Sequence, residues 1–181
     1  MSTAKNLPSA LRLHHNAYVV RDQRVTRKFY EDVIGLPMVA CWTEQDEVFG
    51  GLRIYCHTFF GLADGGALAF FQFESPEEYE QFSRKGRPTP FIHIALKTTA
   101  ENQTAIAERL TGAGYENFVI EHGYCTSLYA TDPDGLNLEF TVDDPRAEQI
   151  NAERMRTKNA DLERWLRGDH SSNNNWRRDN Q

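Results

Sequence analysis

The sequence predicts an α+β fold built from two similar modules, each with one strand, one helix and three further strands in that order. Three observations carry this prediction. The same succession of alternating apolar runs, helical spacing and turn residues occurs twice within residues 10–142. The His-x-Ala triplet that begins at His15 returns at His93, 78 residues later, and the turn and apolar run that begin at Asp64 return at Asp134, 70 residues later.

The first module is expected over about residues 10–74. Its helix begins at Asp22, a residue type that caps helix N-termini, and ends at Gly35, with Val25, Phe29 and Val33 at helical spacing. Alternating and apolar runs predict strands at 13–20, 38–42, 52–60 and 67–73, separated by glycine-rich or acidic turns.

The second module is expected over about residues 90–142, after a polar connection at 75–90 that contains three prolines and room for a short helix. Its helix spans 100–110 and is closed by Gly112 and Gly114. The predicted strands are 91–97, 117–121, 124–131 and 136–142. A repeat of about this length is too long for a solenoid and indicates one domain of two modules, residues 1–142.

Residues 143–181 form a different segment. Residues 143–168 are mostly charged or polar with thinly spaced apolar residues, which is typical of a surface helix that lies on the body or on a partner chain. The tail from Ser171 to Gln181 is expected to be disordered, and Trp176 is the one residue in it that suggests a docking contact.

Composition excludes several classes of protein. The chain has 181 residues, a net charge of −6 and a pI near 5.5, which argues against broad contact with nucleic-acid phosphates. No apolar run is long enough for a membrane span, and the first residues lack a signal-peptide core. Three widely spaced cysteines without a CxxC pair are typical of a reduced compartment. We therefore expect a cytoplasmic protein with no membrane partner.

Three residues are candidates to hold a metal. His15 and His93 occupy equivalent places on the first strand of each module, and strand alternation favours His15 over His14 as the partner of His93. Glu139 interrupts the apolar alternation of the last strand and faces away from its neighbours, whereas the equivalent place in the first module is Ala69. A hydrogen-bonded strand histidine and a solvent-facing strand carboxylate remain the structural alternatives.

Two imidazoles and one carboxylate suit a divalent metal that keeps open coordination positions. Such a set is typical of non-heme Fe(II), which then has places for substrate and dioxygen. The same set can hold Zn²⁺ with a water molecule, as a Lewis acid in hydrolytic or lyase chemistry. The types of the three ligands do not distinguish an Fe(II) site from a Zn²⁺ site.

The two modules, the paired histidines and the ending Asp132-Pro133-Asp134-Gly135-x-x-x-Glu139 resemble the vicinal oxygen chelate superfamily. This superfamily includes glyoxalase I, fosfomycin-resistance proteins, bleomycin-binding proteins and extradiol ring-cleavage dioxygenases. The resemblance covers about residues 10–142. It implies paired βαβββ modules that form a curved mixed sheet around a metal site, and a homodimer to which the 143–168 helix could contribute.

A longer pattern is similar to the extradiol dioxygenases. It runs from His122 through five residues to Leu128 and Tyr129, then to Asp132-Pro133 and on to Glu139. This resemblance implies that His15, His93 and Glu139 bind Fe(II), with Mn²⁺ or Zn²⁺ as alternatives. It also implies that His122 and Tyr129 line the site and hold or move protons. Their structural alternatives are a turn residue and a core aromatic residue.

One feature departs from the family pattern. Two-domain extradiol enzymes carry a further acid–base histidine before the last strand of the metal-binding first module, and here that place is Gly65-Gly66. His57, in the preceding strand, is the nearby candidate for this role; a hydrogen-bonded strand residue is its structural alternative. The departure puts the dioxygenase activity in question, and leaves the metal site untouched.

The expected function is an Fe(II)-dependent dioxygenase that opens the ring of a catechol-type diol with O₂. A glyoxalase-like isomerase or lyase is the first alternative, although Ala69 cannot supply the fourth-strand ligand that such sites take from each module. A non-catalytic protein that binds an aromatic drug is the second, although such relatives generally lack the metal ligands.

Overall fold

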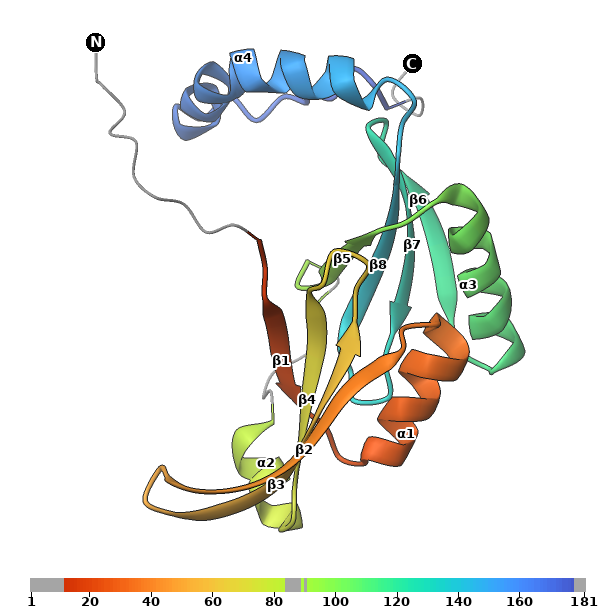
Figure 1. The fold of residues 1–181 in the computed structure, drawn as a ribbon. Helices are drawn as coiled ribbons and strands as arrows, with labels where there is room; N and C mark the ends of the chain where they lie inside the picture. Colours follow the sequence, from red (N-terminus) through yellow and green to blue (C-terminus); the bar gives the residue numbers. More distant parts are fainter. Residues whose placement is uncertain (1–11, 84–88, 90, 178–181) are drawn as a thin grey trace. The chain divides into compact units, whose positions relative to one another are not determined.

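The computed structural model describes residues 12–83, 89 and 91–177, and the chain divides into two compact units, residues 1–87 and 88–181 (Figure 1). Each unit contains one four-stranded sheet with a helix packed on one face. The two units are described separately below. Residues 143–177 group with the second unit.

The first unit has its β-strands in the order β1-β4-β3-β2. Strand β1 runs parallel to β4, and the other neighbours are antiparallel. Its elements are β1 (His15–Val19), α1 (Gln23–Arg27), the π-helical turn η1 (Lys28–Ile34), β2 (Met38–Val48), β3 (Gly51–Gly61), β4 (Ala67–Phe73) and α2 (Pro76–Phe82).

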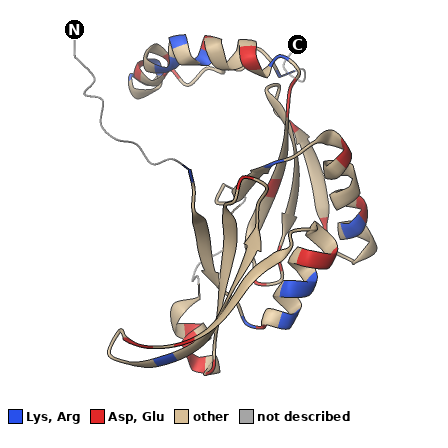
Figure 2. Ribbon diagram, in the orientation of Figure 1, with Lys and Arg blue, Asp and Glu red and all other residues tan. Residues whose placement is uncertain are grey.

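The second unit repeats this arrangement with the strand order β5-β8-β7-β6 and a parallel β5–β8 pair. Its elements are β5 (Ile94–Lys97), α3 (Ala100–Gly112), β6 (Asn117–Glu121), β7 (Cys125–Thr131), β8 (Asn137–Asp143) and α4 (Ala147–Leu166). The predicted α+β fold of two βαβββ modules and a C-terminal helix is confirmed. Both acidic and basic residues occur along α4, as its composition predicts (Figure 2).

The strand registers show that the two modules are equivalent residue by residue. Ala17 of β1 pairs with Ala69 of β4, and Ala95 of β5 pairs with Glu139 of β8. These partners are separated by the same two offsets, 78 and 70 residues, that the sequence repeat shows. Glu139 therefore occupies the place that Ala69 has in the first unit.

Each sheet buries the face that its helix covers. In the first unit the Tyr30 ring packs at 4.6 Å from the Phe70 ring and at 5.4 Å from the Phe60 ring, measured between centroids. In the second unit the buried apolar residues of the helix and strands are Ile106, Leu110, Leu128, Leu138 and Phe140. Because side chains alternate along a strand, the residues between these face the open side of each sheet.

A glutamine fixes the helix to the sheet in both units. Gln23 Nε2 donates to Phe70 O at 2.8 Å, and Gln103 Nε2 donates to Phe140 O at 2.6 Å. Gln103 Nε2 also reaches Thr126 O at 2.9 Å. The carbonyls of residues 70 and 140 are equivalent in the repeat, so the same interaction is made twice. In each unit the amide side chain of the glutamine supplies a donor to backbone carbonyls of the strands.

The structure differs from the sequence prediction at the first hairpin and at β5. Strands β2 and β3 pair continuously from Cys41–Thr58 out to Val48–Gly51, so residues 43–48 are strand where a turn is expected. The Tyr55 hydroxyl donates to Asp46 across this extension, which helps to hold the acidic stretch in the ladder. Strand β5 begins at Ile94, three residues later than expected, and Phe91 is almost fully exposed.

The tail also differs from the sequence prediction, which expects disorder from Ser171. Asn174 Nδ2 donates to the His122 carbonyl at 2.8 Å, and the Arg146 guanidinium lies 4.9 Å from the Trp176 ring centroid. The tail therefore packs on the second unit as far as residue 177. In the sequence, Trp176 is the one residue of the tail that suggests such a contact. Residues 178–181 lie outside the described residues.

Among the described residues, no helix combines the length and the apolar character needed to cross a membrane.

Replacing Gln103 with Ala should lower the free energy of unfolding by about 1–3 kcal/mol, because two carbonyls in the core lose their donor. Urea unfolding followed by circular dichroism measures the change. Gln149→Ala, at an exposed position of α4, is the control and should shift stability by less than about 0.5 kcal/mol. Equal stability of the two variants would contradict the assigned role of Gln103.

Candidate metal and catalytic site

Glu139 is a buried carboxylate in the middle of a sheet. Glu139 is 6% exposed, and it lies on β8 between Ala95 of β5 and Tyr129 of β7. It faces the open side of the sheet, opposite to Leu138 and Phe140. A solvent-facing strand carboxylate, the structural alternative, is therefore wrong for this residue. Because burial of a charge is costly without partners, the surroundings of Glu139 must compensate it.

Three side chains are linked to Glu139 by hydrogen bonds. His93 Nε2 lies 2.7 Å from Glu139 Oε2, and the Tyr129 hydroxyl donates to Glu139 Oε1 at 2.8 Å. His122 Nε2 lies 2.9 Å from the Tyr129 hydroxyl oxygen. We call these four residues, His93, Glu139, Tyr129 and His122, the Glu139 network. The structure thus brings together four of the six residues that the sequence identifies.

The direction of these hydrogen bonds follows from the carboxylate. Since an ionised carboxylate only accepts, His93 donates from Nε2 and Tyr129 donates its single proton to Glu139. The Tyr129 oxygen is then free to accept, and His122 Nε2 is its donor. Coordination of a metal by His93 Nε2 would require that this imidazole carry its proton on Nδ1 instead.

Burial, followed by the hydrogen bond to Glu139, raises the pKa of Tyr129 to about 12. Tyr129 is therefore a protonated phenol near neutral pH. In the Glu139 network the Tyr129 hydroxyl donates to the carboxylate and fixes its orientation. The same hydroxyl oxygen accepts from His122 and so orients that imidazole as well.

The remaining two predicted residues lie in the first unit, on the open face of its sheet. His15 Nδ1 is 2.8 Å from His14 Nδ1, and the His15 ring lies edge-on to Phe59 at 5.6 Å. The His57 ring stacks on Phe71 at 3.7 Å, and its Nε2 is buried without a hydrogen-bond partner among the described residues. Burial, with a smaller contribution from His15, lowers the pKa of His57.

The turn at Gly65-Gly66 explains in steric terms why no histidine stands there. A Cβ at Gly66 would lie 3.0 Å from both Asp64 Oδ1 and the Leu13 carbonyl. Asp64 Oδ1 also accepts from the Gly66 amide at 2.8 Å and so closes the turn. A side chain at residue 66 would disturb that closure.

The donor set of the Glu139 network fits a divalent cation. An imidazole nitrogen and a carboxylate oxygen lie side by side, and both are ligands for Fe(II), Mn(II) or Zn²⁺. A cation would also compensate the buried charge of Glu139. Within residues 12–83, 89 and 91–177, no three His, Cys, Asp or Glu side chains form a group that could hold a metal by themselves. The third ligand, His15, therefore stays a prediction.

Two aromatic residues that the sequence reasoning did not assign also belong to these surroundings. Phe118 of β6 pairs with Tyr129 in register and stacks on its ring at 5.3 Å. Tyr124 stacks on His122 at 5.8 Å. The cross-strand register was the available signal for Phe118, since it pairs with a residue of the dioxygenase pattern. Tyr124 is one of the aromatic residues whose sequence position allows a pocket-lining role, but its contact with His122 depends on the turn after β6 and has no signal in the sequence.

A family comparison agrees with this fold. Residues 12–140 match the sequence profile of the Glyoxalase/Bleomycin resistance protein/Dioxygenase superfamily. The chain therefore belongs to this superfamily, which is the vicinal oxygen chelate superfamily that its sequence resembles. No curated protein matches the chain in sequence.

Several solved structures share the fold at low identity. A mutant of the fosfomycin resistance protein FosX from Listeria monocytogenes, complexed with Mn(II) and 1S,2S-dihydroxypropylphosphonic acid, is 18% identical, with a TM-score of 0.56; the match covers 78% of this chain and 99% of that chain. FosX from Mesorhizobium loti is 22% identical, with the same TM-score and the same coverages. The oxidase ChaP-H2 is 17% identical, with a TM-score of 0.51, over 75% of this chain and 96% of that chain. At these identities the likeness shows the fold alone.

The hydrogen bonds of Tyr129 predict a measurable contribution to stability. Tyr129→Phe should lower the free energy of unfolding by about 1–3 kcal/mol, because Glu139 Oε1 and His122 Nε2 both lose a partner. Tyr124→Phe is a matched control in the same unit, since no hydrogen bond of its hydroxyl is described. Chemical unfolding of the metal-free proteins measures both, and a Tyr129→Phe protein as stable as Tyr124→Phe would contradict the network.

Proposed function

We propose that the protein is an Fe(II)-dependent extradiol dioxygenase that opens the ring of a catechol-type diol next to its two hydroxyl groups. The Glu139 network carries this proposal. It joins an imidazole and a carboxylate suited to a metal with a tyrosine and a histidine suited to handle the protons of a diol. Three of them, His122, Tyr129 and Glu139, belong to the dioxygenase pattern in the sequence, and His93 was selected by the internal repeat; together the four form one hydrogen-bonded chain.

His93 and Glu139 would hold the metal, and His15 is the predicted third ligand. When bound, Fe(II) supplies adjacent coordination positions at which the diol and dioxygen react. The protein contributes a carboxylate that cannot turn away, since Tyr129 fixes Oε1. Oε2, next to His93, is left as the oxygen to coordinate.

His122 and Tyr129 would prepare the diol. A catechol must lose protons to bind a metal through both oxygens, and His122 is the group of the network that can accept one. Tyr129 holds Nε2 of His122 at 2.9 Å, while Tyr124 stacks on its ring. The imidazole is therefore oriented from two sides before a substrate arrives.

The reaction balances without a further reductant. The carbon–carbon bond beside the diol breaks, and both atoms of O₂ enter the ring-opened product, with the ring as the source of electrons. The chain therefore needs only the metal, the diol and O₂. His57 remains the candidate for the additional acid–base histidine, and its buried, unpartnered Nε2 is compatible with that role.

A glyoxalase-like isomerase or lyase that uses Mn²⁺ or Zn²⁺ is the alternative. The Mn(II) in the FosX structure from Listeria supports a divalent metal other than iron for this fold. Ala69 stands against a site that takes one carboxylate from each module. The predicted homodimer stays a prediction, because the structure contains one chain.

The proposal predicts oxygen uptake by the iron-loaded protein. The protein is loaded with Fe(II) without air, mixed with a panel of catechols, and then exposed to air while oxygen and product absorbance are recorded. We expect one O₂ consumed per catechol and a coloured ring-opened product. A fully metallated protein that consumes no O₂ with any catechol would overturn the dioxygenase proposal and favour the isomerase or lyase.

Three variants sharpen this experiment. His15→Ala should abolish uptake, whereas His14→Ala, at the neighbouring and also exposed position, should retain it. Tyr129→Phe should keep its metal and lower turnover by about 10²-fold or more, because His122 loses its positioning contact. Unchanged turnover in Tyr129→Phe would return Tyr129 to a purely structural role.

A further inference from the structure

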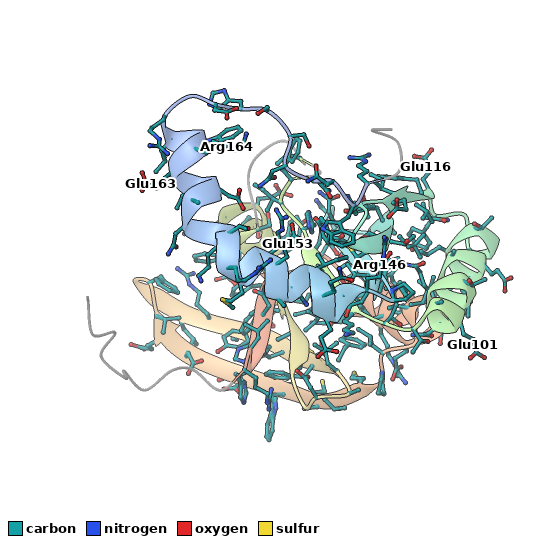
Figure 3. The ribbon with its side chains drawn as sticks, turned by 90° about the horizontal axis from the view of Figure 1, so that it is seen from above. Glu101, Glu116, Arg146, Glu153, Glu163 and Arg164 are labelled. Carbon is teal, nitrogen blue, oxygen red and sulfur yellow. The ribbon has the colours of Figure 1, made fainter. Side chains whose placement is uncertain are left out.

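The tail builds one wall of a pocket in the second unit, apart from the Glu139 network. From Ser171 the chain runs back along α4, so that Arg164 contacts Ser171, Arg154 contacts Asn173 and Arg146 contacts Trp176 (Figure 1). Figure 3 marks Arg146 near the start of α4 and Arg164 near its end. A cavity of about 300 Å³ lies between this tail, the first turns of α4 and Tyr124.

Gly123 shows how closely the tail approaches. A Cβ on Gly123 would lie 2.3 Å from the Arg177 backbone nitrogen and 2.4 Å from the Trp176 carbonyl carbon. Its φ of +85° is also unfavourable for any residue with a side chain. The tail therefore sits on the turn after β6 only because residue 123 has no side chain. The Asn174 side chain also donates a hydrogen bond to the carbonyl of His122, the residue before Gly123.

The lining of the pocket defines the chemistry of a ligand. Ile150 and Ala147 form an aliphatic side, and the rings of Tyr124 and Trp176 add aromatic surface. A volume of about 300 Å³ is at the lower end of ligand pockets, which favours a molecule with one ring. Apolar walls with two aromatic rings favour an aromatic body over a sugar or a flexible chain.

The charges of the lining are already compensated within the protein. Asp143 is paired with Lys97, and Arg154 is paired with Glu153 and Asp161. A charged ligand would therefore find no unpaired opposite charge among these residues. An uncharged molecule is favoured, since it needs no counterion and the other polar residues of the lining, Asn151, Asn173 and Asn174, are themselves uncharged.

The buried side-chain polar atoms of the lining that lack a hydrogen-bond partner among the described residues are donors. The side-chain N–H groups of Trp176 (Nε1) and Arg154 (Nε) are buried without an acceptor among the described residues. No hydrogen bond is described for the Tyr124 hydroxyl. A ligand that brings an oxygen acceptor would relieve this shortage, and a phenolic hydroxyl can both accept and donate.

We propose that this pocket binds uncharged single-ring phenols, as a second ligand site closed by the C-terminal tail. Tyr124 connects the pocket to the Glu139 network, because its ring lines the pocket and stacks on His122. A phenol in the pocket therefore packs against the residue that supports His122. The site requires no metal, so it can be tested independently of the dioxygenase proposal.

The test is a titration of the metal-free, full-length protein with phenol, which has one hydroxyl and cannot chelate. Trp176 is the reporter in a background in which the exposed Trp42 and Trp165 are replaced by Phe. We expect a saturable change in Trp176 fluorescence, at least about tenfold weaker for benzoate, which is charged, and for toluene, which lacks the hydroxyl.

Three variants locate the site. Gly123→Ala should displace the tail, and Ala147→Leu should fill the pocket, and each should weaken phenol binding at least about tenfold. Gly114→Ala is the matched control for Gly123→Ala, since its φ is +82° and a Cβ there meets nothing within 4 Å. It should bind phenol like the parent protein.

Three results would overturn the proposal. They are the absence of saturable phenol binding in the parent protein, affinity unchanged in both Gly123→Ala and Ala147→Leu, and loss of binding in His93→Ala alone, which would place phenol at the Glu139 network. Because no metal is present, failure here leaves the dioxygenase proposal standing, and failure of oxygen uptake leaves this site standing.

Discussion

The burial of one carboxylate is the constraint on which the second unit depends. Glu139 is 6% exposed in the middle of β8, where a charge is costly unless it is paired. Its two oxygens are held by Tyr129 and His93, and His122 is attached through Tyr129. A carboxylate placed in this way is pre-oriented on the open face of the sheet. A divalent cation beside it would remove the remaining electrostatic cost, which is the physical reason to regard it as a ligand.

The two modules show how one scaffold can support a site on one side and packing on the other. At equivalent positions of the two sheets, Glu139 corresponds to Ala69 and Tyr129 to Phe59. The helix-covered faces keep the same interactions, including the glutamine bonds of Gln23 and Gln103. The modules therefore differ where the open faces carry chemistry, and they agree where the sheets must hold their helices.

The equivalence of the two modules and the position of Glu139 could be predicted from sequence, because a repeat indicates which residues of the two sheets correspond. The two offsets made Glu139 the counterpart of Ala69, and the strand registers agree with this, because Ala17 pairs with Ala69 and Ala95 pairs with Glu139. The extended β2–β3 hairpin escaped prediction because its acidic residues look like a turn until Tyr55 pairs with Asp46. The docked tail escaped it because its main requirement is an absent side chain, at Gly123. Backbone contacts between residues far apart in the chain leave no periodic pattern in the sequence.

The central claim is that Glu139 is a metal ligand, and the metal content of its variants tests this most directly. Wild type, Glu139→Ala and Glu116→Ala would be loaded with Fe(II) anaerobically, desalted and analysed by mass spectrometry of the elements. Glu116 is an exposed carboxylate of the same unit, labelled in Figure 3. The account predicts about one iron per chain in wild type and Glu116→Ala, and loss of most of it in Glu139→Ala. Full iron content in a folded Glu139→Ala protein would contradict the account.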